Sequence, residues 1–334
     1  MLVDLFDYAL PAASIAQRPR PRGQSRLLRL SREGGAVSHH AFPELPALLR
    51  PGDLLVRNDA RVMPARLLGR TPDGREVELF LTGPAAQSGT CLARPGRRAK
   101  TGAVIQLPEG VEARIEEVEP GGLRRVRFTP PLSAELLERI GHVPLPPYIR
   151  RPDEEEDRTS YQTIYARTPG SVAAPTAGLH FTTETFSALD ARGVEVADVS
   201  LRVGPGTFRP VIADDTAQHR MDAEAVRIPS SAADAIRRAR HDRRRVAAVG
   251  TTVTRALEAW AREEREEFET DLFITPGFEF RIVDALVTNF HLPKSTLLML
   301  VAAFAGRVAV LAAYAEAIRE GYRFYSYGDA MLID

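Results

Sequence analysis

The sequence predicts an α/β protein: a main α/β domain with an inserted small antiparallel β-barrel domain. From residue 148 onward, strand-like apolar runs alternate with helix-like stretches, which is typical of α/β domains. Between residues 59 and 128, short apolar runs recur between Gly, Pro and Asp residues, which is typical of small barrels or sandwiches. A chain of 334 residues is long enough for two domains. We therefore expect an α/β domain from residues 1–58 and 148–334 and a barrel from residues 59–147.

The elements expected before residue 148 are short. A helix over 43–50 and a strand over 53–57 come first. The expected barrel strands are residues 65–68, 76–81, 90–93, 103–107, 111–118 and 123–128. A helix over 134–140 follows them, with Ser133 as its N-cap and Gly141 just after its end.

The elements expected after residue 148 alternate in type. The helices are expected over 184–192, 231–240 and 253–264, and the strands over 194–199, 200–203, 246–249 and 284–288. The nearly apolar run 296–314 is predicted as one buried helix that Ser295 caps. Arg307 lies at its middle and would cost about 2.5–3.5 kcal/mol inside a bilayer, so we expect no membrane span.

Composition excludes several classes of protein. The chain has 44 basic and 44 acidic residues, so no overall field favours nucleic acid. Its one cysteine, Cys91, excludes a disulfide framework and a Cys-rich zinc site. The first residues do not form an apolar signal segment, and we expect a cytoplasmic protein.

The most unusual segment is 170–181, which contains no charged side chain in a heavily charged chain. Pro175 and Gly178 argue against a helix interior, and small residues let the backbone approach a ligand closely. Ser171, Thr176 and His180 are the polar groups of this apolar frame. Taken alone, such a segment more often forms a buried turn around a structural histidine, and the alternative is a pocket lining for a flat, uncharged group.

Two further segments predict polar groups at strand ends. Val249 ends a strand and is followed by Gly250, Thr251 and Thr252 at a helix start, which favours an anion at free backbone N–H groups or ordinary helix capping. After the next strand, Asn289 and His291 would stand at a carboxyl end, where α/β domains bind ligands. Two such turns together make a site more probable than either alone.

Two more segments could contact a ligand. Gly204 and Gly206 follow a strand, but Arg209 occupies the third position of a dinucleotide fingerprint, which we therefore reject. The loop 204–208 could bring backbone against a ligand or form a plain turn. The segment 322–329 interleaves aromatic rings with Asp329, and either stacks a base or forms a strand that seals the core.

Taken together, these segments resemble the S-adenosylmethionine:tRNA ribosyltransferase-isomerase family of queuosine biosynthesis. The match spans nearly the whole chain. The matching residues are 6–11, 15–17, 25–28, 52–58, 61–67, 141–149, 161–163, 171–181, 206–208, 249–252, 288–296, 304–306 and 322–331.

This resemblance implies an unusual use of S-adenosylmethionine, as a ribosyl donor. The acceptor would be 7-aminomethyl-7-deazaguanine at the wobble position of tRNA, and the products epoxyqueuosine-tRNA, adenine and methionine. It implies no prosthetic group and no metal; the sequence is silent on oligomeric state, and we favour a monomer.

Roles for individual residues follow as hypotheses. We expect His180 and Asp329 to be catalytic. The expected substrate-binding residues are Thr176, Gly178, Gly206, Thr207, Gly250, Thr251, Thr252, Asn289, His291 and Tyr327. The expected tRNA-binding residues are Arg26, Arg61 and Arg66.

Two positions depart from the family pattern. Arg202 and Asp222 stand where histidines are typical, which leaves open a non-catalytic tRNA-binding relative. A different nucleoside-modifying transferase, such as a zinc-dependent base exchanger, is a third possibility, against which the single cysteine argues.

Overall fold

A nine-stranded sheet organises the larger domain of this computed structural model, which describes residues 1–204, 211 and 213–334. Its centre is four parallel strands in the order β13 (Glu195–Arg202), β3 (Leu54–Asn58), β15 (Val246–Val249) and β17 (Ala285–Asn289). The remaining strands are β14 (Glu224–Arg227) and β16 (Glu267–Thr270) beyond β13, and β18 (Ala330–Ile333), β1 (Arg26–Leu30) and β2 (Val37–Ala41) beyond β17. The predicted α/β class is confirmed.

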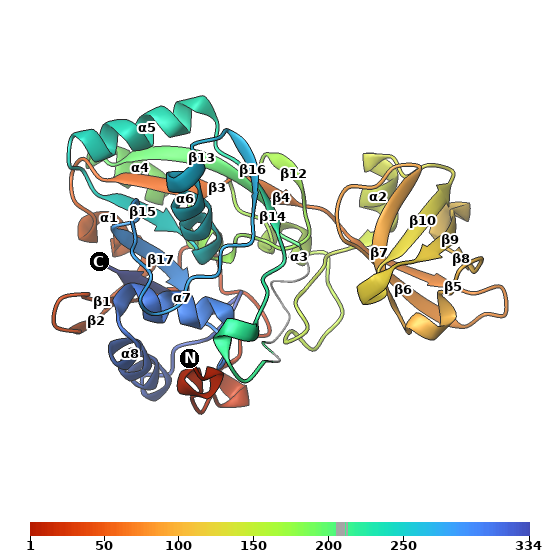
Figure 1. The fold of residues 1–334 in the computed structure, drawn as a ribbon, viewed down its shortest axis with the longest axis horizontal. Coiled ribbons are helices and arrows are strands. Elements are labelled where there is room, and N and C mark those ends of the chain that lie inside the picture. The colour runs from red at the N-terminus through yellow and green to blue at the C-terminus, as the bar shows by residue number, and fades with distance from the viewer. Residues whose placement is uncertain (205–210, 212) are drawn as a thin grey trace.

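Helices cover both faces of this sheet (Figure 1). Successive side chains of a strand point to opposite faces, so Leu54 and Val56 pack into one core cluster and Leu55 into another. The first cluster lies under α5 (Ser230–His241), α6 (Thr251–Glu263), α7 (Thr296–Ala305) and α8 (Arg307–Arg319). The second lies under α1 (Leu45–Leu48) and α4 (Thr183–Ala191). Such burial on both faces explains why β15, between β3 and β17, is wholly apolar.

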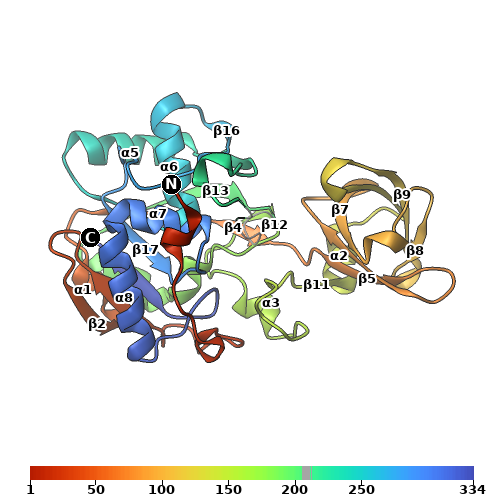
Figure 2. The ribbon, with the colours of Figure 1, turned by 60° about the horizontal axis from the view of Figure 1, so that its bottom comes forward.

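The second domain is a closed six-stranded antiparallel barrel with its own apolar core. Its strands are β5 (Arg66–Arg70), β6 (Glu76–Leu81), β7 (Ser88–Arg94), β8 (Val104–Gln106), β9 (Glu112–Val118) and β10 (Arg124–Thr129). The pairing of β5 with β8, at Arg70 and Gln106, closes it. Figures 1 and 2 show the barrel standing to one side of the α/β domain.

Short elements join the two bodies. The helix α2 (Ala134–Ile140) packs on the barrel core, and the Ser133 side chain accepts from Leu136 N–H as its predicted N-cap. The strand β11 (Gly141–His142) adds to β5. In the α/β domain, β4 (Ala60–Val62) pairs with β12 (Thr168–Ser171), and α3 (Asp157–Ser160) lies between them in sequence. The barrel strands fall inside residues 59–147, and the domain boundaries themselves stay predictions.

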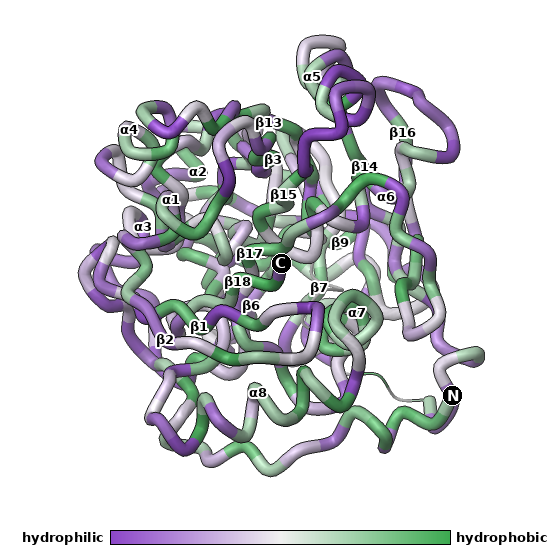
Figure 3. Tube along the Cα trace, turned by 90° about the vertical axis from the view of Figure 1, so that its left-hand side faces the viewer, coloured by the Kyte–Doolittle hydropathy of each residue, from purple (hydrophilic) through white to green (hydrophobic). Residues whose placement is uncertain are grey.

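Three predicted elements differ from the structure. The run 296–314 is not one helix, because Gly306, at φ 84°, ends α7 before α8 begins. Figure 3 shows α7 as a mainly hydrophobic helix. The two strands expected over 194–203 form the single strand β13, and α5 begins at Ser230 after Pro229, without a side-chain cap.

In the part of the chain that the structure describes, no single helix is long and apolar enough to cross a membrane. The helices α7 and α8 reach that length and composition only as a pair, and they meet at 113°.

Candidate active site

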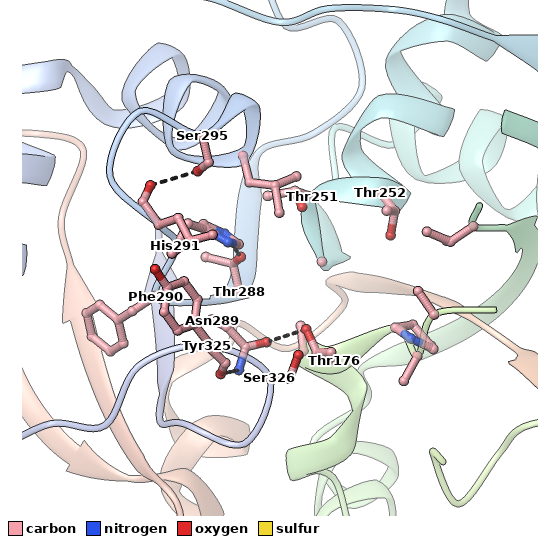
Figure 4. Close-up of a pocket in the computed structure, with 18 of the residues that line it drawn as sticks. Thr176, Thr251, Thr252, Thr288, Asn289, Phe290, His291, Ser295, Tyr325 and Ser326 are labelled. Carbon is pink, nitrogen blue, oxygen red and sulfur yellow. Dashed lines mark hydrogen bonds between the residues drawn. The ribbon is translucent and has the colours of Figure 1, made fainter. Parts of the chain in front are cut away.

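A cavity of about 260 Å³ opens at the carboxyl ends of the neighbouring parallel strands β15 and β17. Ligands of open α/β sheets bind at such strand ends. The lining residues are Tyr148, 173–177, Val203, 250–252, 288–293, 295–297, Tyr325 and Ser326. None of these described residues has a formally charged side chain, so hydroxyls, amides, aromatic rings and backbone N–H groups supply the polarity (Figure 4).

One wall of the cavity is the N-terminus of α6. Gly250 is its N-cap at φ 96°, a conformation that residues with a Cβ rarely adopt. Neither Thr251 nor Thr252 caps the helix, because both lie inside its first turn. The N–H groups of Thr251, Thr252 and Val253 have no hydrogen-bond acceptor among the described residues. With the positive end of the helix dipole behind them, they form a place for an anion.

Asn289, the last residue of β17, connects the cavity wall to the protein interior. Its Oδ1 accepts from the Thr176 hydroxyl at 3.0 Å. Its Nδ2 donates to the carbonyl oxygen of Tyr325 at 3.1 Å and to His180 Nε2 at 3.0 Å. A carbonyl oxygen can only accept, so the Tyr325 contact fixes which end of the amide is nitrogen. This amide therefore holds the 176 and 325 segments against β17 (Figure 4).

His180 lies behind Asn289 and does not line the cavity. Because its Nε2 accepts from Asn289, Nδ1 carries the proton and donates to the Ser25 hydroxyl at 2.8 Å. Burial, with a smaller contribution from Arg22, lowers the pKa of His180 to about 3. The ring is therefore neutral, and both of its nitrogens are occupied. This geometry gives His180 the task of positioning Asn289.

His291 does line the cavity, and it is also neutral, because burial lowers its pKa to about 3. Its Nε2 shares a hydrogen bond of 2.8 Å with the Thr288 hydroxyl. Its backbone N–H donates to the Tyr314 hydroxyl at 3.1 Å, and its carbonyl oxygen accepts from the Tyr8 hydroxyl. The turn after β17 is thus held from three sides.

Asp329 is fully buried and closes a loop instead of facing the cavity. Its carboxylate accepts from the backbone N–H groups of Arg26 and Arg323, at 2.9 and 2.8 Å. Its own N–H donates to the carbonyl oxygen of Arg323. Asp329, which we expected to be catalytic, therefore lies where it fixes the 323–329 loop, which carries Tyr325 and Ser326 to the cavity wall.

Two predicted binding residues also lie away from the cavity. Gly178 is a packing glycine, because a Cβ there would lie 2.0 Å from the Tyr165 hydroxyl. The Tyr327 hydroxyl donates to Asp157 Oδ1 at 2.7 Å. Asp157 is itself buried in an ion pair with Arg151 at 2.6 Å. Gly206 and Thr207 lie outside the described residues.

The three predicted tRNA-binding arginines occupy different places. Arg26 stacks 3.8 Å over the Tyr322 ring and donates to the carbonyl oxygen of Glu320. Arg61 lines a crevice where the barrel joins the α/β domain, 3.7 Å from Glu138.

Arg66 lines a second groove, between the barrel and residues 145–153, and pairs with Glu78 at 2.8 Å. Arg202 and Asp222, which depart from the family pattern, are exposed, and neither lines the cavity.

Sequence reasoning placed Thr176, Gly250, Thr251, Thr252, Asn289 and His291 at one site, and all six line the cavity. It did not assign Tyr148, Thr288, Ser295, Tyr325 or Ser326 to the site. The signal for Tyr325 was present in the aromatic segment 322–329, but alternation of rings does not show which ring faces a ligand. Among the described residues, no group of three or more His, Cys, Asp or Glu side chains could hold a metal ion.

This is an open α/β protein with an uncharged cavity at its parallel strand ends, where such sheets bind ligands, and with a helix N-terminus in the cavity wall, where an anionic group is stabilised. The chain belongs to the queuosine biosynthesis protein family, whose model matches residues 3–333. The resemblance stated from the sequence is thereby confirmed.

Individual relatives match over their full lengths. An S-adenosylmethionine:tRNA ribosyltransferase-isomerase of Rubrobacter xylanophilus is 51% identical over 338 residues, covering 100% of this chain and 98% of that protein. One from Moorella thermoacetica is 50% identical over 344 residues, covering 100% of both. The crystal structure of S-adenosylmethionine tRNA ribosyltransferase from Thermotoga maritima matches with a TM-score of 0.57 and 39% identity, over 99% of this chain and 100% of that one.

Proposed function

We propose that this protein is an S-adenosylmethionine:tRNA ribosyltransferase-isomerase. It transfers and isomerises the ribosyl moiety of S-adenosylmethionine onto 7-aminomethyl-7-deazaguanine at the tRNA wobble position. The products are epoxyqueuosine-tRNA, adenine and methionine. The observation that carries the proposal is the full-length match to enzymes of that name, combined with an uncharged cavity at the strand ends. A cytoplasmic location and a monomeric state belong to the same proposal.

The cavity suits the two chemically different ends of S-adenosylmethionine. The methionine carboxylate is placed at the free N–H groups of Thr251 and Thr252, since an anion is stabilised at a helix N-terminus. The adenosyl group is placed against the aromatic and small residues of the wall, among them Ala174 and Tyr325. No basic side chain of the described lining would repel the positive sulfonium.

The reaction starts from the acidity that the sulfonium confers on the adjacent carbon. A base removes that proton, and adenine leaves with a proton in its place. The aminomethyl nitrogen of the tRNA base then attacks the sugar and releases a proton, and methionine leaves as the epoxide closes. In this scheme we assign positioning roles to His180 and Asp329. Their support is that His180 orients Asn289 and Asp329 closes the loop of Tyr325.

For tRNA we propose the junction of the two domains. Arg61 lines the crevice that also contains Glu138, and Arg66 lines the groove beside residues 145–153. Arginine binds phosphate through a planar, permanently charged group. Arg26 stays in the proposal as a third contact, although it lies beside α8 and is engaged by Tyr322.

The test is direct. The purified protein is incubated with S-adenosylmethionine and tRNA that carries the aminomethyl precursor, and the digested nucleosides are analysed by mass spectrometry. We expect epoxyqueuosine in the tRNA and one adenine released per modified base. Saturable tRNA binding with no adenine formed would instead support the alternative hypothesis of a non-catalytic tRNA-binding relative, which Arg202 and Asp222 left open.

A further inference from the structure

Tyr325 has a feature that the fold alone does not require. Its side chain is only 5% exposed and lines the cavity. Its hydroxyl has no hydrogen-bond partner within the described part of the chain. Buried polar groups are nearly always paired, because an unpaired one loses its bonds to water without replacement. Tyr325 therefore combines a buried, unpaired phenol with a place in the cavity lining, which makes it a candidate ligand contact.

The backbone of Tyr325 is held in an unfavourable conformation. Its φ is 72°, in the left-handed region that bulky residues avoid. Three hydrogen bonds hold it there: its N–H donates to Phe290, and its carbonyl oxygen accepts from Asn289 and Gly328. Strain of this kind concentrates at functional sites, where surrounding contacts stabilise it. Here those contacts come from β17 and from the loop that Asp329 closes.

The ring is fixed as firmly as the backbone. It stacks on Tyr148 with ring centroids 4.5 Å apart and an interplanar angle of 23°. Burial raises the pKa of the Tyr325 phenol, so the hydroxyl keeps its proton at neutral pH. A protonated phenol held in place is a hydrogen-bond donor that needs no reorganisation when a ligand arrives.

We propose that the Tyr325 hydroxyl donates a hydrogen bond to an uncharged acceptor on the adenosyl group of S-adenosylmethionine. This inference rests on the proposed function. It assigns the adenosyl group, not the methionine carboxylate, because the carboxylate has the free N–H groups of Thr251 and Thr252. In Figure 4, Thr252 lies to the right, and Tyr325 and His291 lie to the left. Tyr148 and Tyr325, whose rings stack on each other, also make this part of the cavity wall aromatic. Aromatic surfaces favour stacking with a purine.

The test compares Tyr325→Phe with the wild-type protein by isothermal titration with S-adenosylmethionine and with S-adenosylhomocysteine, which keeps the adenosyl group but lacks the sulfonium charge. We expect the Kd of both ligands to rise about tenfold, the effect of one lost hydrogen bond. The free energy of unfolding in urea should stay unchanged or increase, because the removed hydroxyl was unpaired. If the hydroxyl had only a structural role, Tyr325→Phe would have the opposite effect: the free energy of unfolding would fall and the Kd of both ligands would stay unchanged.

Tyr165→Phe is the matched control. The Tyr165 hydroxyl is also buried and unpaired, but Tyr165 does not line the cavity, so both Kd values should match those of the wild type. An unchanged Kd in Tyr325→Phe would overturn the inference while leaving the proposed function intact. So would weaker binding of S-adenosylmethionine alone, which would place the contact outside the adenosyl group. Failure of the wild-type protein to bind either ligand would overturn the proposed function together with the inference.

Discussion

The neutral histidines His180 and His291 predict a loss of stability in mild acid. Their side chains are buried, with only 4% and 7% of each residue exposed. Burial lowers the pKa of each to about 3, whereas an unfolded histidine titrates near 6.5. As pH falls from 6.5 toward 3, the two histidines become protonated in the unfolded state but stay neutral in the folded state. Stability that is complete above pH 6.5 is therefore lost in this window.

The magnitude follows from the two pKa values. Within the window, each histidine lowers the free energy of unfolding by about 1.4 kcal/mol per pH unit. At pH 5, one and a half units below the unfolded pKa, the loss is about 2 kcal/mol per histidine and about 4 kcal/mol for the pair. Natural domains have only about 5–15 kcal/mol in total, so the effect is large.

The assay is urea unfolding at pH 7, 6 and 5 of the wild-type protein, His180→Gln and His291→Gln. Glutamine does not titrate, and at position 180 its amide oxygen can accept from Asn289 as Nε2 does. Each variant should lose about half of the pH dependence between pH 7 and 5. His241→Gln is the control, because that side chain is 90% exposed and should leave the dependence unchanged. A full wild-type pH dependence in both His180→Gln and His291→Gln would refute the reasoning.

Three further predictions concern the cavity wall, the loop and the tRNA surface. Gly250→Ala should lower the free energy of unfolding by about 1–3 kcal/mol, because φ 96° strains any residue with a Cβ, and should weaken S-adenosylmethionine binding measured by titration. Asp329→Asn should cost about 1–3 kcal/mol in urea unfolding, because one backbone N–H of Arg26 or Arg323 loses its acceptor. It should also lower kcat/KM, since the loop of Tyr325 is no longer closed. Arg61→Ala should weaken tRNA binding and reduce the slope of log affinity against log salt by about 1.

Each of these has an outcome that would contradict it. Gly306 also has a positive φ, so Gly306→Ala should lower the free energy of unfolding without weakening S-adenosylmethionine binding. If both variants lost affinity equally, Gly250 would not contact the ligand. An Asp329→Asn protein with wild-type kcat/KM would separate the loop from function. If Arg61→Ala left the slope of log affinity against log salt unchanged, tRNA would not contact Arg61 at the domain junction.

The sequence predicted the cavity wall well where local pattern and sheet topology coincide. Gly250 and Asn289 each follow a buried apolar run, and parallel neighbours bring their carboxyl ends to one edge. The same reasoning found the barrel, whose strand β6 matches the predicted run 76–81. In both cases, the information lies within a few consecutive residues.

The rest depends on contacts between distant residues, which local pattern does not show. His180 looked like a cavity residue, but Asn289, 109 residues away, lies between it and the cavity. Asp329 was expected to be catalytic, and local pattern did not show that its carboxylate accepts from the N–H of Arg26, 303 residues away. Gly306 divides α7 from α8 because the chain turns there by 113°, which an apolar composition does not reveal.

The central claim is that S-adenosylmethionine binds in the cavity between Gly250 and Tyr325. A crystal structure of the wild-type protein with S-adenosylmethionine tests it most directly. We expect the methionine carboxylate at the N–H groups of residues 251–253 and the adenosyl group within reach of the Tyr325 hydroxyl. Ligand density in the groove lined by Arg66, with this cavity filled only by water, would contradict the account.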